Sequence, residues 1–309
     1  MVMPAVRPTT GSILGARVEG LDLSQPLSGD EIVLIARNLG VYGVLCFPGQ
    51  DLDAAALKAF GARFGSLEVN VAASLYASEF PEVMVLSNIV ENGRPIGLPD
   101  AGQDWHTDMS YSRTIAFATI LHAIRIPRRN GHALGNTEFL NMHAAYADLP
   151  RAIKERLQYA TARHDFNKFW EMMRREKGSN RPPLSDEQRR QKPPVSHPIF
   201  LRHPVTGHFV LYVNPGYAMC IDDISSRESD ELLQMLFEHQ LQPKYRYTHE
   251  WTEHDVLMWD DIGTVHRAIG DYGADEHRLM KRCQVLADRV FDADFLGAAV
   301  GTIEHPTRR

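Results

Sequence analysis

The sequence predicts a mainly β protein, an antiparallel sandwich or barrel with helices at its flanks. From residue 83 onward, short apolar segments of strand length recur, separated by proline, glycine and asparagine. Two stretches with helical spacing, about 141–163 and 226–240, interrupt these strands. The chain has 309 residues, of which 44% are hydrophobic and 23% charged, so it can bury a sizeable core. We expect a single domain over residues 1–309.

The first third is expected to mix helix and strand. Ser28 and Glu31 form a capping-box pattern, and apolar residues follow at helical spacing as far as Gly43. A second helix is predicted to begin near Asp53 and to stop at Gly65. A short apolar run between the two helices is expected to be a buried strand.

The remaining elements follow from the same patterns. Pro150 is expected to split the helical stretch at 141–163, and Ser225 or Ser226 can cap the helix at 226–240. The strand candidates are 83–86, 116–124, 209–213, 245–251, 256–259 and 279–287.

The segment 166–198 differs in composition, because it combines the pairs Pro182-Pro183 and Pro193-Pro194 with a basic run and shows little apolar periodicity. A connection of this length is expected to be a lid or a partner-contacting excursion, or a solvated flap without a role.

Charge and cysteine content exclude several classes of protein. A formal net charge of −6 gives no sign of a nucleic-acid or membrane partner, and no apolar run is long enough to span a bilayer. The N-terminus lacks the apolar core of a secretory signal, so we expect a cytoplasmic protein. Cys46, Cys220 and Cys283 form no CxxC pair and are expected to be small buried hydrophobic residues.

The run Trp105-His106-Thr107-Asp108 indicates a metal site. In an extended chain, His106 and Asp108 point to the same face and can bind one cation. The pattern alone is weak, because a turn or core histidine is the commoner case. His266, which follows the predicted strand 256–259 and Asp261, can complete a set of two histidines and one carboxylate. This set leaves open positions on the metal and is typical of oxygen-activating iron(II) sites.

A predicted strand near the C-terminus carries two arginines on one face. Arg278, Met280 and Arg282 alternate along this strand. If that face is interior, two buried guanidinium groups require an anionic partner, and arginine binds a carboxylate through two hydrogen bonds. If the face is exposed, the arginines would form surface ion pairs.

Taken together, these motifs resemble the taurine dioxygenase (TauD/TfdA) family of iron(II)- and 2-oxoglutarate-dependent dioxygenases. The resemblance covers about residues 11–290. The motifs that carry it are 15–23, 47–50, 64–65, 105–108, 212–216, 259–261 with His266, and 278–282. It implies a double-stranded β-helix (jelly roll) with flanking helices. It also implies hydroxylation of a substrate by dioxygen, with conversion of 2-oxoglutarate to succinate and carbon dioxide.

The resemblance also implies roles for individual residues. His106, Asp108 and His266 should bind iron(II), while Arg278 and Thr137 should hold 2-oxoglutarate. Arg282 should lie near the iron, close to the co-substrate or to an acidic group of the substrate. The carboxylate at Asp108 favours hydroxylation, because the related halogenases have a small residue there.

The expected substrate is a small, acidic organic molecule other than taurine. Asn70 stands where the taurine enzymes carry a sulfonate-contacting histidine, and Tyr111, Phe169 and Trp170 could shape an apolar or aromatic pocket beside Arg282. The family resemblance further implies a homo-oligomer, a dimer or a tetramer, with no nucleic-acid or membrane partner.

The sequence departs from the family pattern at two places, and two other functions fit the same ligands. The approach to Thr137 is about three residues longer than usual, and the stretch from His266 to Arg278 is one residue longer. The alternatives are a jelly-roll zinc hydrolase or isomerase that uses the same three ligands, and a catalytically silent binding module.

Overall fold

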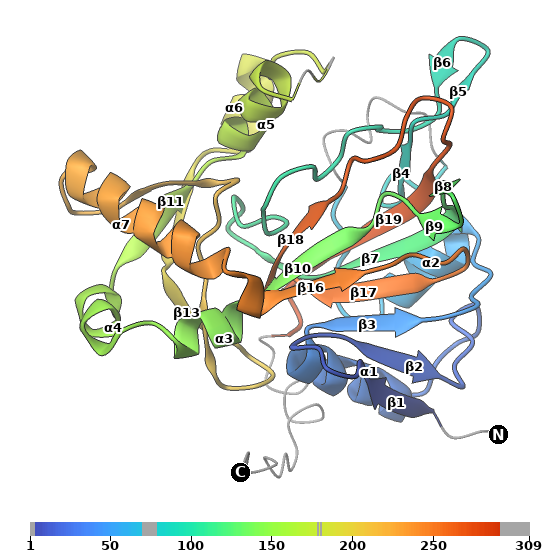
Figure 1. Ribbon diagram of the computed structural model, residues 1–309, viewed down its shortest axis with the longest axis horizontal. Helices are drawn as coiled ribbons and strands as arrows, with labels where there is room; N and C mark the ends of the chain where they lie inside the picture. Colours follow the sequence, from blue (N-terminus) through green and yellow to red (C-terminus); the bar gives the residue numbers. More distant parts are fainter. Residues whose placement is uncertain (1–3, 70–78, 178, 180, 291–309) are drawn as a thin grey trace.

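The computed structural model describes residues 4–69, 79–177, 179 and 181–290. Its core is a jelly roll made of a seven-stranded sheet that faces a three-stranded sheet (Figure 1). In sheet order, the larger sheet contains β1 (Ala5–Pro8), β2 (Ala16–Glu19), β3 (Val44–Phe47), β17 (Val256–Asp260), β7 (Ala116–Arg125), β19 (Leu279–Leu286) and β4 (Met84–Ser87). The smaller sheet contains β16 (Arg246–His249), β10 (Thr137–Asn141) and β18 (Thr264–Ala268).

The central strands are apolar on both faces because both faces are covered. Along β17, Leu257 and Trp259 join the core between the two sheets, whereas Val256 and Met258 join the core beneath the helices. The two sheets meet at Phe139 of β10 and Trp259, whose rings lie 5.6 Å apart. These strands therefore appear in the sequence as continuous apolar runs without alternation.

Two helices cover the outer face of the larger sheet. α1 (Gly29–Tyr42) contacts β3 and β17, and α2 (Ala54–Gly61) contacts β19. The capping box is confirmed: the Ser28 hydroxyl accepts a hydrogen bond from the Glu31 amide, and the Glu31 carboxylate accepts one from the Ser28 amide. Gly43 ends α1 with a positive φ of 68°.

The predicted end of the second helix at Gly65 is wrong, because α2 ends at Gly61 and the chain then turns. The sequence has glycine at 65 for another reason. A Cβ there would lie 2.4 Å from the Leu286 carbonyl oxygen. Only glycine therefore allows the backbone at 65 to approach the end of β19 this closely.

A side layer of helices and short strands flanks the jelly roll (Figure 1). It contains α3 (Met142–Ala147), α4 (Arg151–Leu157), α7 (Ser226–Gln240), a 3-10 turn at Pro243–Tyr245, the sheet β12 (Val195–Pro198), β11 (Thr161–His164) and β15 (Ala218–Ile221), and the pair β13 (Phe200–Arg202) and β14 (Phe209–Leu211). Two small hairpins, β5 (Val90–Glu91) with β6 (Arg94–Pro95) and β8 (Arg128–Arg129) with β9 (His132–Ala133), complete the strands.

Predictions for this layer are partly confirmed. Pro150 separates α3 from α4, and Ser225 caps α7. The helix expected to reach residue 163 ends at Leu157, because Thr161–His164 pairs with β12 and β15 as a strand.

The expectation of little apolar periodicity in 166–198 is wrong. This segment contains α5 (Phe166–Arg175) and α6 (Asp186–Gln191). Phe166, Phe169, Trp170 and Met173 lie at helical spacing on α5, and all four are buried. Among the described residues, no helix is long and apolar enough to cross a membrane.

Candidate metal centre and adjoining pocket

The two predicted ligand histidines are joined through their backbones. His106 forms an isolated antiparallel bridge with His266 of β18. The His106 amide donates to the His266 carbonyl at 3.0 Å, and the His266 amide donates to the His106 carbonyl at 2.8 Å. A directly opposed pair of this kind brings its side chains close together, and the imidazole centroids lie 4.3 Å apart.

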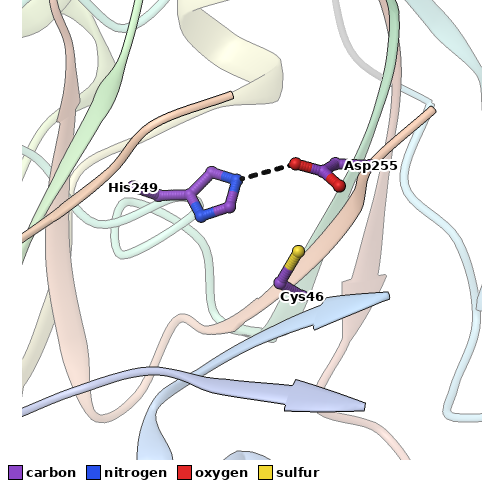
Figure 2. Close-up of side chains that lie close together, drawn as sticks. All are labelled: Cys46, His249 and Asp255. Atoms are coloured by element: carbon purple, nitrogen blue, oxygen red, sulfur yellow. Dashed lines mark ion pairs between the residues drawn. The ribbon is translucent and has the colours of Figure 1, made fainter. Parts of the chain in front are cut away.

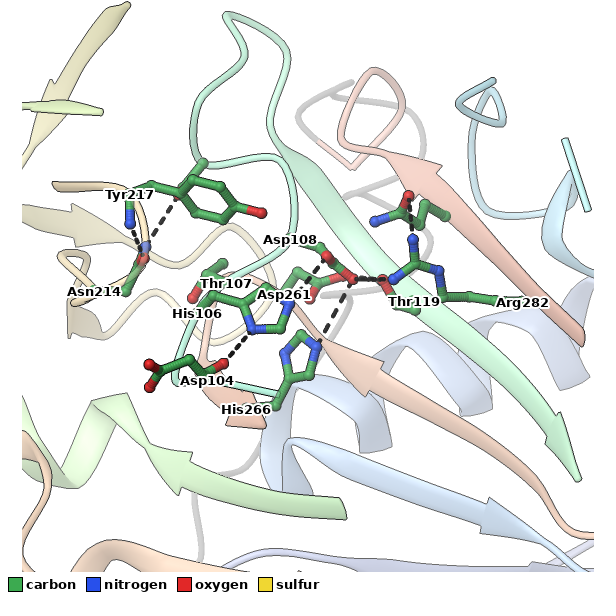
Figure 3. A network of polar contacts seen from close by, with 12 residues as sticks. Asp104, His106, Thr107, Asp108, Thr119, Asn214, Tyr217, Asp261, His266 and Arg282 are labelled. Atoms are coloured by element: carbon green, nitrogen blue, oxygen red, sulfur yellow. Dashed lines mark hydrogen bonds and ion pairs between the residues drawn. The ribbon is translucent and has the colours of Figure 1, made fainter. Parts of the chain in front are cut away.

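Asp108 completes a cluster that the structure brings to one point (Figure 3). Asp108 Oδ1 lies 3.5 Å from His106 Nε2, and Oδ2 lies 3.8 Å from His266 Nε2. One donor atom from each residue lies within 4.8 Å of the others, and all three side chains are buried. We call His106, Asp108 and His266 the metal triad.

The donor set suits a divalent cation. His106 Nδ1 lies 2.7 Å from the Asp104 carbonyl oxygen, which can only accept, so Nδ1 carries the proton and the Nε2 lone pair is free. Burial, followed by the charge of neighbouring His106, lowers the pKa of His266 well below its usual value. His266 is therefore neutral, as a metal ligand must be.

Asp108 is held as a carboxylate. Burial by itself raises its pKa, but the charge of the Arg282 guanidinium, together with the adjacent histidines, outweighs this effect and lowers the pKa well below its usual value. Arg282 Nη1 lies 3.6 Å from Asp108 Oδ2. Two neutral imidazoles and one carboxylate form the ligand set of mononuclear iron(II) sites with open positions.

Behind Asp108 lies a second carboxyl group that the sequence analysis did not identify as part of the site. The Thr119 hydroxyl lies 3.0 Å from Asp108 Oδ2 and 2.7 Å from Asp261 Oδ2, and Trp259 Nε1 donates to Asp261 Oδ1 at 3.0 Å. Burial, followed by the charge of Asp108, raises the pKa of Asp261 well above its usual value. The only sequence feature that could have indicated Thr119 is that it is a polar residue within the apolar run that forms β7.

A pocket extends from the metal triad to Arg278. Thr137, Arg278 and Arg282, which the resemblance assigned to the co-substrate, line it together with Leu86, Ala101, Gly102, Leu121, Trp259, His266 and Ala268. Arg278 is buried and its Nε has no hydrogen-bond partner within the described residues. A buried guanidinium with an unpaired N–H beside a pocket suits an anionic ligand.

The longer approach to Thr137 is explained by a hairpin. β8 and β9 form it, and its turn contains Asn130 and Gly131, both with positive φ. The chain then reaches Gly135, whose φ is +71° and whose carbonyl accepts a hydrogen bond from Arg278 at 3.2 Å.

The residues expected at the substrate lie in an aromatic cluster beside the metal triad. Phe169 lies 5.0 Å from the His106 ring, and Tyr111 lies 4.7 Å from the ring of Tyr217. Trp170 belongs to the same cluster but contacts Phe166 and Arg181. Asn70 lies outside the described residues.

The loop 214–217, which was not predicted to be part of the site, packs against this cluster. Gly216 donates to the Trp105 carbonyl oxygen at 3.1 Å, and a Cβ at Gly216 would lie 2.9 Å from His106 Cβ. Asn214 accepts a hydrogen bond from the Tyr217 amide (Figure 3) and donates one to the Ser110 hydroxyl. The sequence signal was the Asn-Pro-Gly turn.

Comparisons with known proteins agree with this geometry. A family model described as taurine catabolism dioxygenase TauD, TfdA family matches residues 5–284. Pentalenolactone F synthase of Streptomyces avermitilis is 32% identical over 289 residues, which cover 90% of this chain and 92% of that protein. An alpha-ketoglutarate-dependent 2,4-dichlorophenoxyacetate dioxygenase of Burkholderia sp. (strain RASC) is 32% identical over 285 residues, covering 88% and 91%. The structure of AAD-2 in complex with Mn(II) and N-oxalylglycine superimposes with a TM-score of 0.74 at 28% identity, covering 92% and 98%.

Gly135→Ala should destabilise the protein more than Gly131→Ala. Both positions have a positive φ, so both substitutions strain the backbone by about 1–2 kcal/mol. Only at 135 would the new Cβ also lie 2.7 Å from Arg278 Nε, whereas nothing lies within 4 Å at 131. The free energy of unfolding of each variant, measured in urea, checks this. An equal decrease in Gly135→Ala and Gly131→Ala would contradict the close contact.

Proposed function

Because the chain belongs to the TauD/TfdA family, we propose that it hydroxylates a small organic acid at an iron held by His106, Asp108 and His266. The chain is an iron(II)- and 2-oxoglutarate-dependent dioxygenase that acts on a small organic substrate. When bound, the iron supplies the oxidation of substrate by dioxygen, coupled to decarboxylation of 2-oxoglutarate to succinate and carbon dioxide. Zinc hydrolysis and a silent module are set aside, since the relatives are dioxygenases.

One observation carries the assignment of the ligands: three buried donors from distant parts of the chain converge within 4.8 Å. The backbone bridge sets the spacing of the histidines, and the Asp104 carbonyl orients His106. Asp108 supplies the one negative charge of the set. With these three protein ligands, a bound iron would keep positions open for the co-substrate and dioxygen.

The pocket beside the metal triad supports a dicarboxylate co-substrate. We assign the distal carboxylate to Arg278, whose guanidinium has an unpaired Nε–H, and to Thr137, which lines the same pocket. The Thr137 hydroxyl already accepts a hydrogen bond from Trp251 Nε1 at 3.1 Å, so its own proton is free to be donated to a carboxylate. The other end of the molecule would then reach the metal beside His266.

The substrate is proposed to carry an acidic group and an apolar or aromatic part. Arg282 is buried near Asp108 and offers a cation, while Tyr111 and Phe169 offer an aromatic wall. One relative acts on 2,4-dichlorophenoxyacetate, which combines both features. We keep Asn70 and Trp170 as candidate substrate residues from the sequence.

The segment 166–198 is proposed as a lid within a single domain over residues 1–309. Its helix α5 brings Phe169 against the His106 ring, so a movement of α5 would change access to the metal triad. A homo-oligomer, dimer or tetramer, and a cytoplasmic location also belong to this proposal.

His106→Ala should abolish succinate formation and lower iron(II) affinity at least about tenfold, because it removes one of three metal ligands. Succinate release with iron(II), 2-oxoglutarate, oxygen and a panel of small acids measures the first effect, and anaerobic iron titration the second. His122→Gln is the control, since His122 is equally buried but bonds the Gln50 carbonyl instead. Unchanged turnover in His106→Ala would refute the assignment.

Arg278→Ala should raise the KM for 2-oxoglutarate by about 10- to 150-fold, since a charge-assisted hydrogen-bond pair contributes roughly 1.5–3 kcal/mol. The KM for the substrate should change little. Steady-state kinetics with each compound varied in turn would check this, and an unaltered 2-oxoglutarate KM would remove Arg278 from the co-substrate site.

Arg282→Ala should raise the KM for an acidic substrate more than the KM for 2-oxoglutarate. Lys281→Ala is the matched control, because Lys281 is the preceding residue on the same strand and points to the opposite face. If both KM values stay at the wild-type level in Arg282→Ala, the acid-binding role of this arginine is wrong.

A further inference from the structure

A second group of metal-binding side chains lies between the two sheets, outside the metal triad. Cys46 comes from β3, His249 ends β16, and Asp255 lies in the turn before β17 (Figure 2). One donor atom from each lies within 4.8 Å of the other two. His249 Nε2 and Asp255 Oδ2 are 3.5 Å apart, close to the roughly 3.4 Å expected for nitrogen and oxygen ligands on one tetrahedral zinc ion.

One ring nitrogen of His249 is buried without a hydrogen-bond partner among the described residues. The residue is only 6% exposed, and its Nε2 has no hydrogen-bond partner within the described residues. Buried polar atoms are normally paired, so this nitrogen requires an explanation. Figure 2 shows it directed toward Asp255, with the Cys46 sulfur beside both.

The surroundings of His249 favour a free lone pair at Nε2. Its Nδ1 lies 3.4 Å from the Tyr247 hydroxyl, which can accept a hydrogen bond from Nδ1–H. In that tautomer Nε2 is unprotonated and directed toward Asp255 and Cys46. Asp255 is fixed by its turn, because its carboxylate accepts a hydrogen bond from the Thr252 amide at 3.0 Å.

Without a bound cation, the Cys46 side chain is a protonated thiol and not a thiolate. Burial, followed by the charge of Asp255, raises the pKa of Cys46 far above its usual value. A divalent cation would reverse this effect, since a coordinated thiol loses its proton.

A third group with similar donors, His143, His203 and Asp260, is less suited to a cation because of the tautomer of His203. His203 Nδ1 accepts hydrogen bonds from the amides of Val205 and Thr206 at 3.2 and 3.1 Å. Neutral His203 must therefore carry its proton on Nε2, which lies 2.9 Å from Asp260 Oδ2. A protonated nitrogen cannot bind a metal, so His203 offers no ligand atom in this tautomer.

We propose that Cys46, His249 and Asp255 form a second divalent-cation site, distinct from the iron centre, that selects zinc. Thiolate, imidazole and carboxylate are all ligands of zinc, and the thiolate favours zinc over iron(II) or magnesium. A water molecule would take the fourth position. The bound ion would cross-link β3 of the larger sheet to β16 of the smaller sheet.

Cobalt(II) titration tests the site, because a sulfur-to-cobalt charge-transfer absorption arises only from a thiolate ligand. The metal triad contains no sulfur, so cobalt bound there gives no such band. The wild-type protein and Cys283→Ser should develop the band, since Cys283 is buried but belongs to none of the metal-binding groups formed by the described residues. Cys46→Ser should not develop it. Absence of the band in the wild-type protein, or its persistence in Cys46→Ser, would overturn the proposal.

His249→Gln provides a second variant that keeps every cysteine. Its cobalt affinity, measured from the same band, should fall by roughly a hundredfold, because one of three protein ligands is lost. Circular dichroism confirms that each variant is folded before titration. Wild-type affinity in a folded His249→Gln would contradict the site, and zinc should displace cobalt from the wild-type protein and abolish the band.

Discussion

The backbone bridge between His106 and His266 is the constraint on which the rest of the site depends. Two hydrogen bonds of 3.0 and 2.8 Å hold segments 160 residues apart in the sequence at one fixed separation. β18 is in turn paired with β10, so the same strand that carries His266 also positions Thr137 at the pocket. His266 of the proposed metal site and Thr137 of the proposed co-substrate site therefore lie in one hydrogen-bonded sheet, so a shift of β18 would move both.

The charges around the metal triad are balanced by neighbouring side chains. Asp108 is buried and anionic, Arg282 lies 3.6 Å from it, and Asp261 is the carboxyl group whose pKa rises. Two buried carboxylates this close to one another cannot both be charged at low cost, and the arginine determines which one is. A cation at the metal triad adds to the stabilisation of Asp108, whereas Asp261 supports it through Thr119 without competing as a ligand.

The sequence predicted the long, strongly patterned parts of this structure. The capping box of α1, the apolar runs of β7 and β17, and the spacing of His106, Asp108 and His266 were visible because each depends on residues close together in the chain or on an ordered set of motifs. The short strands β10 and β18 were missed, because their pairing is decided by distant partners. Asp104 acts through its backbone carbonyl, which no side-chain pattern reveals, and α5 was obscured by the basic residues that surround its four apolar positions.

Phe169 belongs to α5, a helix outside the two main sheets, and this placement bears on how the pocket beside the metal triad can change between related proteins. The proposed iron ligands lie on or beside core strands such as β17 and β18, where a change in side-chain volume disturbs packing. Phe169 instead comes from α5, a helix in a peripheral excursion that buries only one stripe of side chains. With the role proposed for Phe169, substitutions along that helix would change which substrates fit and leave the proposed metal ligands unchanged.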